Sequence, residues 1–175
     1  MKLILVRHTT LDIEAGICYG QSDILPSVNF VEEADIVRDK LKKLNSARVY
    51  TSPLERCRKL AEFCGFENTI IDDRLMELNF GEWELKPWNE IKGEYAEKWF
   101  KDYYNIACPG GETLKDLVKR IKDFVNELYK VNSDNIIAFT HSGPIRVFHQ
   151  ILNGTKAEDL FDLNIEYGGV YTFQL

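Results

Sequence analysis

Two histidines follow short runs of aliphatic residues and are accompanied by arginines, residue types that bind and transfer phosphoryl groups. The pair Arg7-His8 ends the run Leu3–Val6, and His141 ends the run Asn135–Thr140. Aliphatic runs without polar alternation are typical of strands buried on both faces, and a charged pair inside such a strand would be costly. We therefore expect both histidines at strand ends, where open α/β sheets bind their ligands.

A second arginine is predicted to reach the same edge of the sheet. Arg48–Thr51 is typical of another short strand, and Ser52 is expected to cap the helix that follows it, with Glu55 completing a capping box. Arg56 would then lie in the first helical turn. Two imidazoles and two guanidiniums in one pocket suit a dianionic phosphoryl group, because guanidiniums offer paired donors to its oxygens.

These groups could perform covalent phosphoryl transfer. A histidine beside fixed cations is biased toward its neutral form, and neutral imidazole is a nucleophile that can attack phosphorus. The leaving alkoxide then needs a proton. Glu77 is the best candidate donor, with Glu82 and Glu84 behind it, because apolar neighbours would favour the protonated carboxyl. The alternative is that these acids are solvated loop charges.

Composition limits the classes of protein that the chain can belong to. Its 175 residues suffice for one domain, 45% are hydrophobic, and the net charge of -6 without a basic block argues against general nucleic-acid binding. The cysteines lack metal-ligand spacing, which favours reduced thiols and a cytoplasmic location. No stretch is long enough to span a membrane. The oligomeric state is left open, with a homodimer as one option.

Periodicity predicts alternating strands and helices, the pattern of right-handed βαβ crossovers. The loop from Thr9 to Ser27 is long enough to be functional. Further predicted elements are a helix over 29–45, a helix from Ser52 to Gly65, a strand over 69–71, a long helix after Thr113, a helix over 142–152, a short helix over 157–161 and a final strand over 169–175.

The segment 74–108 differs from the rest because it concentrates aromatic residues, including all three tryptophans of the chain. One interpretation is a small helical part that buries its own rings. The other is that one or two rings line a substrate pocket and stack on an aromatic group. We expect this segment to be a lid-like insertion within a single domain over 1–175.

Five motifs resemble, in order, those of the histidine phosphatase superfamily, which includes the cofactor-dependent phosphoglycerate mutases. They are Leu5-Val6-Arg7-His8-Thr9, Ser52-Pro53-Leu54-Glu55-Arg56, the segment from Glu77 to Glu84, Pro109-Gly110-Gly111-Glu112-Thr113 and Thr140-His141-Ser142-Gly143. By matching position, His8 resembles the phosphorylated nucleophile and Glu77 the proton donor. Arg7, Arg56 and His141 resemble the phosphate pocket, with no metal and no cofactor.

The resemblance also implies a fold and a substrate. The fold is a three-layer α/β/α sandwich, phosphoglycerate mutase-like, whose mostly parallel sheet has one antiparallel strand. The short chain and the loop from Cys18 to Asp23 look most like the α-ribazole phosphatase branch. This implies hydrolysis of α-ribazole 5′-phosphate, an intermediate of cobalamin assembly. The residues expected to bind substrate are Tyr19, Gly20, Gln21 and Ser142.

The chain departs from the family pattern at three positions. Thr9 and Leu85 replace glycines, and Glu14 falls where many relatives have a phosphate-binding Asn. An acid there would repel phosphate, so Glu14 is expected to point away. His149 lies inside a predicted helix, away from any strand end, and is expected to be structural or to lie on the surface.

Several alternatives remain beside the leading hypothesis of a phosphatase acting on a small phosphorylated metabolite. A broad sugar-phosphate phosphatase shares its chemistry, whereas a phosphoglycerate mutase would need insertions that the chain lacks. A metal-dependent hydrolase has no matching ligand motif. A non-catalytic phosphate-binding module would need the arginine pocket but not Glu77.

Overall fold

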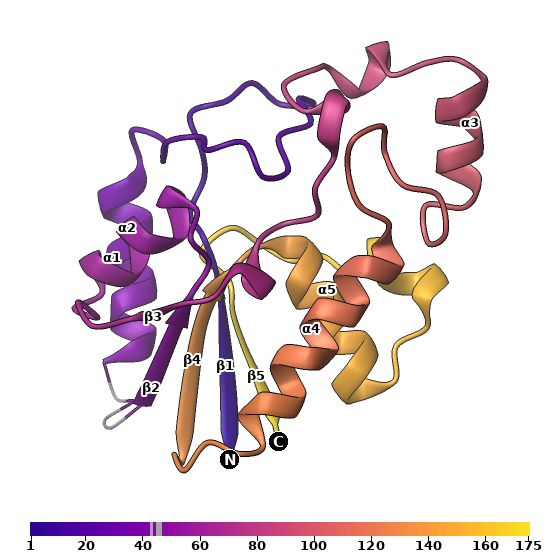
Figure 1. The fold of residues 1–175 in the computed structure, drawn as a ribbon. Helices are drawn as coiled ribbons and strands as arrows, with labels where there is room; N and C mark the ends of the chain where they lie inside the picture. The colour runs from indigo at the N-terminus through magenta and orange to yellow at the C-terminus, as the bar shows by residue number, and fades with distance from the viewer. Residues whose placement is uncertain (43, 45–46) are drawn as a thin grey trace.

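The computed structural model describes residues 1–42, 44 and 47–175, and its centre is a five-stranded sheet with the order β3-β2-β4-β1-β5 (Figure 1). The strands β1, β2, β3 and β4 run parallel, and β5 pairs antiparallel with β1. The predicted mostly parallel sheet with one antiparallel strand is therefore confirmed. The strands are β1 (Lys2–Arg7), β2 (Ala47–Thr51), β3 (Ile70–Ile71), β4 (Asn135–Thr140) and β5 (Val170–Gln174).

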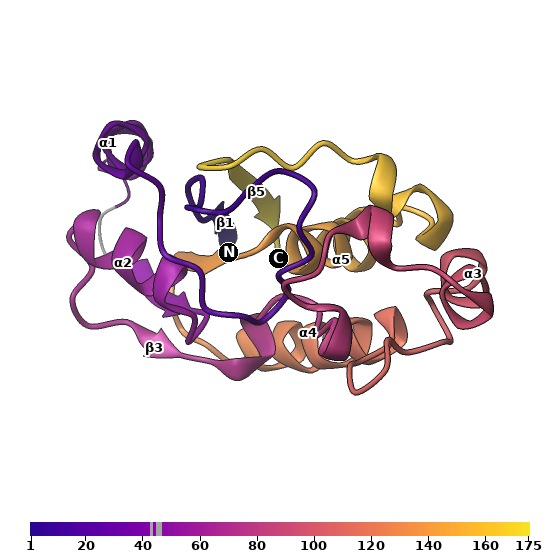
Figure 2. The same ribbon diagram turned by 90° about the horizontal axis from the view of Figure 1, so that it is seen from above.

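Alternate residues of the central strands enter two separate hydrophobic cores. Leu3 and Leu5 pack on one face with α4 (Leu114–Leu128) and α5 (Ser142–Asn153). Ile4 and Val6 pack on the other face with α1 (Phe30–Leu41) and α2 (Glu55–Phe63). Figures 1 and 2 show these helix pairs on opposite sides of the sheet. The expected three-layer α/β/α sandwich is confirmed, because strands buried on both faces need helices on both.

Two predicted helix boundaries differ from the structure. The helix expected over 29–45 ends at Leu41, and positions 43 and 45 lie outside the described residues. The capping box predicted at Ser52 is wrong, because α2 begins only at Glu55 and its N-cap residue makes no side-chain hydrogen bond. Asp23 instead accepts a hydrogen bond from the Glu55 amide at 2.9 Å, so a distant loop serves this helix end.

Short helical elements make up most of the segment from Asp73 to Lys101, and its rings form a small core of their own. Trp83 and Trp99 are buried edge to face, with ring centroids 5.1 Å apart, and Phe80 meets Trp88 in the same way at 5.2 Å. Most of the aromatic rings of this segment therefore serve to bury one another. The elements are η1 (Asp73–Leu75), η2 (Gly81–Trp83), η3 (Trp88–Glu90) and α3 (Glu94–Lys101), and η4 (Ala157–Asp162) lies near the C-terminus.

This aromatic segment and the loop after β1 meet above the carboxyl ends of the strands. Ile17 and Pro87 form an isolated antiparallel bridge, and the Cys18 amide donates to the Lys86 carbonyl at 3.0 Å. Figure 2 looks down on this contact. Two segments far apart in sequence thus cover the edge of the sheet where the histidines were expected.

Leu85, which replaces a glycine of the family pattern, has an unusual backbone conformation. Its φ of 66° lies in the left-handed region, where a Cβ atom meets the backbone and costs about 1–2 kcal/mol. The side chain is 59% exposed, so packing contributes little to its stability. The Leu85 amide donates to the Cys18 carbonyl at 2.6 Å, which fixes this turn against the loop after β1.

We predict that Leu85→Gly is more stable than Leu85→Ala by about 1 kcal/mol, because both lose the same packing and only alanine keeps a Cβ atom. Leu25 is the matched control, since it is similarly exposed but has an ordinary φ. There the alanine variant should be the more stable one. Urea unfolding of the four variants measures both differences, and the same order at both positions would contradict the prediction.

Candidate active site

The carboxyl ends of β1, β4 and β2 bring the two predicted histidines together. Arg7 lies opposite Thr140 in the β1–β4 register, so His8 and His141 are the next residues of neighbouring strands. Their ring centroids are 5.2 Å apart with the planes tilted by 59°, and both side chains are buried. The expected convergence of the two strand ends is confirmed.

His8 is held with one ring nitrogen free. Its Nδ1 lies 2.8 Å from the Thr9 carbonyl oxygen, which can only accept, so Nδ1 carries the proton and Nε2 keeps its lone pair. Burial, followed by the charges of Arg56 and Arg7, holds the pKa of His8 well below its usual range. The expected neutral imidazole is thus supported, with burial ahead of the cations as its cause.

His141 has the opposite tautomer. Arg56 Nε donates to its Nδ1 at 3.2 Å, so Nε2 carries the proton and donates to the Ser52 hydroxyl at 2.8 Å. This contact explains why Ser52 does not cap α2. Burial lowers the pKa of His141, and the Arg56 charge lowers it further. Both histidines are therefore neutral at neutral pH.

Arg56 is fully buried, and no carboxylate of the described residues pairs with it. Its terminal nitrogens donate to the carbonyls of Ser22 at 2.7 Å and Gly20 at 2.6 Å. Each of these nitrogens has a second N–H, so the guanidinium can still donate to an anion. Carbonyl dipoles hold this cation in place without cancelling its charge.

The turn that holds Arg56 is itself fixed by Glu84. The carboxylate accepts from the amides of Gln21 at 2.9 Å and Ser22 at 2.6 Å. A Cβ atom at Gly20, where φ is 38°, would lie 2.3 Å from a Glu84 oxygen, so only glycine fits. The Gln21 side chain donates to the Glu77 carbonyl at 2.9 Å. Gly20 and Gln21, predicted to bind substrate, thus help to build the wall of the site.

The guanidinium of Arg7 lies over the ring of a tyrosine that was not among the predicted site residues. Its guanidinium carbon is 3.7 Å from the Tyr167 ring centroid, and its Nη1 donates to the Ile165 carbonyl. Its buried Nε has no hydrogen-bond partner among the described residues. The Tyr167 hydroxyl lies 3.0 Å from that of Tyr19, and burial together with Tyr167 raises the pKa of Tyr19.

Glu77 is bound to the beginning of α5. Its carboxylate accepts from the Gly143 amide at 3.0 Å, the Leu78 amide at 2.9 Å and the Ser142 hydroxyl at 3.1 Å. The apolar neighbours predicted for this carboxyl are present in part, because Leu78 and Phe80 line the same cavity as Glu77, but polar donors also converge on the carboxylate. A Cβ atom at Gly143 would lie 2.1 Å from Glu77 Oε1, so the carboxylate needs a glycine there.

Arg120 of α4 fixes the backbone that carries Glu77. It donates to the carbonyls of Arg74 at 2.6 Å, Met76 at 2.7 Å and Glu77 at 2.9 Å. Its guanidinium also pairs with Glu112 at 2.6 Å. The sequence analysis missed this residue because its charge lies on an ordinary amphipathic helix, where solvated arginines are common.

A cavity of about 250 Å³ opens beside Glu77 and the start of α5. Three of the four residues predicted to bind substrate line it, namely Tyr19, Gly20 and Ser142, and Gln21 does not belong to the described lining. Their contact with a substrate stays a prediction. Most of the wall is apolar and includes the rings of Phe80, Trp88 and Phe161. The lining also includes Arg146, which the sequence analysis did not single out.

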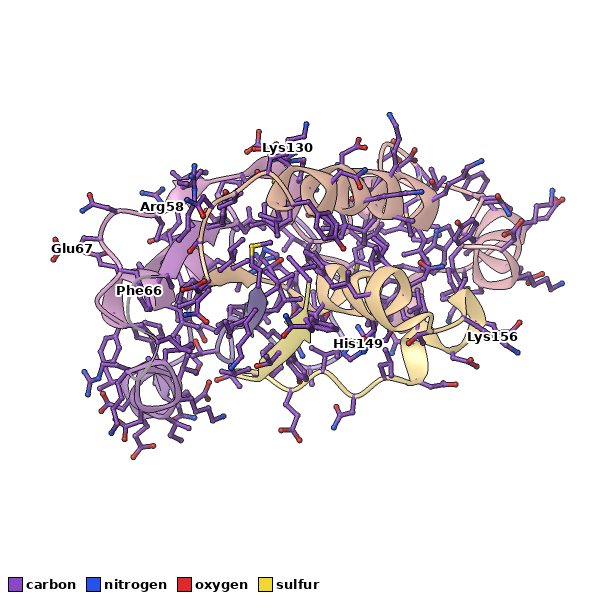
Figure 3. All side chains as sticks on the ribbon, turned by 90° about the horizontal axis from the view of Figure 1, so that it is seen from below. Arg58, Phe66, Glu67, Lys130, His149 and Lys156 are labelled. Carbon is purple, nitrogen blue, oxygen red and sulfur yellow. The ribbon has the colours of Figure 1, made fainter. Side chains whose placement is uncertain are left out.

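Other candidate residues lie elsewhere. Glu82 and Glu14 are exposed, the latter as expected. His149 packs its ring 4.8 Å from that of Phe173, and Figure 3 shows it on α5, seen from below, so the structural assignment holds.

The cysteines and helices of the described residues add three observations. Cys18, Cys57, Cys64 and Cys108 are free thiols. Across the described ranges, no cluster of three or more His, Cys, Asp or Glu could hold a metal ion. Nor does any helix of those ranges have the length and apolar character needed to cross a membrane.

Comparisons with known proteins agree with this geometry. Residues 3–175 match the family model of the histidine phosphatase superfamily (branch 1). Phosphoserine phosphatase 1 of Hydrogenobacter thermophilus is 28% identical over 88% of this chain and 77% of its own. Adenosylcobalamin/alpha-ribazole phosphatase of Salmonella typhimurium is 26% identical over 96% and 87%. The crystal structure of the alpha-ribazole phosphatase from Shigella flexneri has a TM-score of 0.90 at 22% identity, covering 98% of this chain and 89% of that one.

We predict that the two buried histidines make the free energy of unfolding depend on pH. Both have pKa values lowered by folding, so only the unfolded chain takes up their protons as the pH falls below about 6.5. The free energy of unfolding should be insensitive to these groups above pH 7. Below pH 6.5 it should fall by up to about 1.4 kcal/mol per pH unit for each histidine.

Urea unfolding at pH 7.5, 6.5 and 5.5 measures this slope. The double variant His8→Asn/His141→Asn should flatten it, whatever its absolute stability. An equal slope in the double variant and the parent chain would show that these histidines are not the cause.

Proposed function

Because the chain belongs to the histidine phosphatase superfamily and is a phosphatase, we propose that it hydrolyses a small phosphorylated metabolite through a phosphohistidine on His8. The observation that carries the proposal is a neutral, buried His8 whose Nε2 keeps its lone pair and whose ring centroid lies 5.2 Å from that of His141. A neutral imidazole with its other nitrogen anchored is a fixed nucleophile. Arg7 and Arg56, which form no ion pair in the part of the chain that the structure describes, lie beside it to receive the phosphoryl oxygens.

In the first step, the lone pair of His8 Nε2 attacks phosphorus and an N–P bond forms. The ester P–O bond breaks, and its electron pair stays on the leaving oxygen, which takes a proton from the Glu77 carboxyl. Arg7 and Arg56 stabilise the charge on the three phosphoryl oxygens. His141, polarised by Arg56, lies across from the nucleophile and completes the pocket.

In the second step, water attacks the phosphohistidine. The Glu77 carboxylate takes a proton from the water as the new P–O bond forms. The N–P bond breaks, its electron pair returns to His8 Nε2, and inorganic phosphate leaves. Protons balance over the cycle, because Glu77 gives one in the first step and regains one in the second.

Two substrates have support in different observations. α-Ribazole 5′-phosphate, implied by the loop from Cys18 to Asp23, is supported by the name of the Salmonella relative and by the rings of Phe80, Trp88 and Phe161 on the cavity. A phosphorylated hydroxy acid such as phosphoserine is supported by the name of the Hydrogenobacter relative and by Arg146. A phosphate-release panel that includes sugar phosphates ranks them, and isomerisation of a phosphoglycerate would indicate a mutase instead.

His8→Ala should lower kcat by at least about 10³-fold, because the covalent intermediate cannot form. The same variant should lose the acid-labile label that ³²P-substrate leaves on the enzyme. His149→Ala is the matched control, because His149 packs on Phe173 rather than at the site, and it should keep both signals. Turnover retained by His8→Ala would falsify the nucleophile assignment.

The loss of hydrolysis rate in Glu77→Gln should depend on the leaving group of the substrate. An alkoxide needs a proton, so hydrolysis of alkyl esters should slow by about 10²–10⁴-fold, whereas p-nitrophenyl phosphate should lose less than about tenfold. Glu82→Gln, an exposed acid of the same segment, should leave both rates unchanged. Equal losses on the two substrates would exclude Glu77 as the acid. If the protein were a non-catalytic phosphate-binding module, Glu77→Gln and Glu82→Gln would bind phosphate equally well.

A further inference from the structure

We propose that Arg146 binds a carboxylate on the leaving group of the substrate, so that the preferred substrates are phosphomonoesters of small hydroxy acids or hydroxy amino acids. The inference rests on the proposed function, because it needs the leaving group to lie in the cavity beside Glu77. There the proton donor, Ser142 and Gly143 all contribute to the lining.

The position of Arg146 suits this role. It follows Ser142 by four residues on α5, so the two side chains lie on one face of the helix, about 6 Å apart along its axis. Both line the cavity together with Glu77. The proton donor and Arg146 therefore face the same cavity from positions about one helical turn apart.

The guanidinium of Arg146 has donors to spare. One terminal nitrogen donates to the Leu163 carbonyl at 3.1 Å, while Nε is buried without a hydrogen-bond partner among the described residues. Burial lowers the pKa of this side chain, and the charge of Glu77 offsets part of that effect. A partly desolvated guanidinium with an unpaired N–H gains most from a planar anion, whose two oxygens match its paired donors.

No partner within the described residues neutralises this charge. None of the ion pairs formed there includes Arg146, and the Glu77 carboxylate is occupied by amide and hydroxyl donors. Arg146 is also the one lysine or arginine in the described cavity lining. An anion that enters beside Glu77 therefore meets a single cation, one helical turn away.

The size of the cavity agrees with a small acid. Its volume of about 250 Å³ lies below the roughly 300–1,000 Å³ of pockets that enclose drug-sized ligands. The leaving group of α-ribazole 5′-phosphate is larger and presents no acidic group to Arg146. The inference therefore ranks a carboxylate-bearing ester above it and leaves the phosphoryl transfer chemistry unchanged.

Matched substrates test the proposal directly. Phosphoserine and phosphoethanolamine differ only in the carboxylate, as 3-phosphoglycerate and glycerol 3-phosphate differ only in a carboxylate that replaces an alcohol. The full chain should prefer each acid by at least about tenfold in kcat/KM. Arg146→Gln should lose about 10–100-fold on the acids, mainly through KM, and less than about threefold on the neutral partners and p-nitrophenyl phosphate.

Two further variants keep the test decisive. Arg146→Lys retains the charge without the paired donors and should fall between the parent chain and Arg146→Gln. Arg58→Gln removes an exposed arginine of α2, on the other side of the sheet from α5 (Figure 3), and should change neither ratio. If Arg146→Gln does not fold, the substrate ratios of the parent chain and of Arg146→Lys still decide.

Three results would overturn the inference. They are equal use of acids and neutral partners by the parent chain, equal losses on both in Arg146→Gln, and a preference for α-ribazole 5′-phosphate over phosphoserine. Each leaves p-nitrophenyl phosphate hydrolysis dependent on His8, so the proposed function would survive. Failure to release phosphate from any ester, p-nitrophenyl phosphate included, would instead reject the proposed function.

Discussion

The site depends on two guanidiniums that are held at the end of a buried sheet without carboxylates. The chain carries 28 acidic and 22 basic residues, yet neither Arg7 nor Arg56 takes part in an ion pair within the described ranges. Carbonyl oxygens of Ile165, Gly20 and Ser22 hold them instead. Carbonyl dipoles orient a cation without cancelling its charge. The positive potential is therefore preorganised for an anion, which is what electrostatic catalysis requires.

Charged side chains in turn fix the backbone around the site. One charged side chain fixes the turn that supplies carbonyls to Arg56, and another fixes the segment that carries Glu77. Glu84 binds the amides of the 20–22 turn whose carbonyls hold Arg56, and Arg120 binds the carbonyls of the segment that carries Glu77. Burial keeps the histidines neutral, and the charges of Arg56 and Arg7 add to this effect, because protonation would place a third buried positive charge beside them.

Sequence patterns predicted the part of the molecule that local rules determine. Aliphatic runs ending in His8 and His141 specify strands, strand ends specify an edge, and alternating helices specify a parallel order that makes the two strands neighbours.

The residues that were missed act across long separations. Ser52 was assigned to a cap because the sequence does not show His141 as its partner, and Tyr167 lies against Arg7 only because β5 returns antiparallel to β1. Arg120 and Arg146 lie on amphipathic helices, where the same residues are usually solvated. Glu77 was expected among apolar side chains because its sequence neighbours are apolar, whereas in space it also meets the Gly143 amide and the Ser142 hydroxyl at the start of α5.

The helix α5 links the chemistry to the choice of substrate. Its first residues, Ser142 and Gly143, hold the carboxylate of the proposed acid, and the next turn presents Arg146 to the same cavity. The two parts differ in what they tolerate. Position 143 must be glycine because a Cβ atom would collide with Glu77. Arg146 affects that carboxylate through the electrostatic interaction of the two charges. A substitution at 146 can therefore change which leaving group binds without moving the groups that transfer the phosphoryl. In this arrangement the phosphoryl transfer groups stay constant, and the residue that selects the leaving group lies one helical turn away on α5.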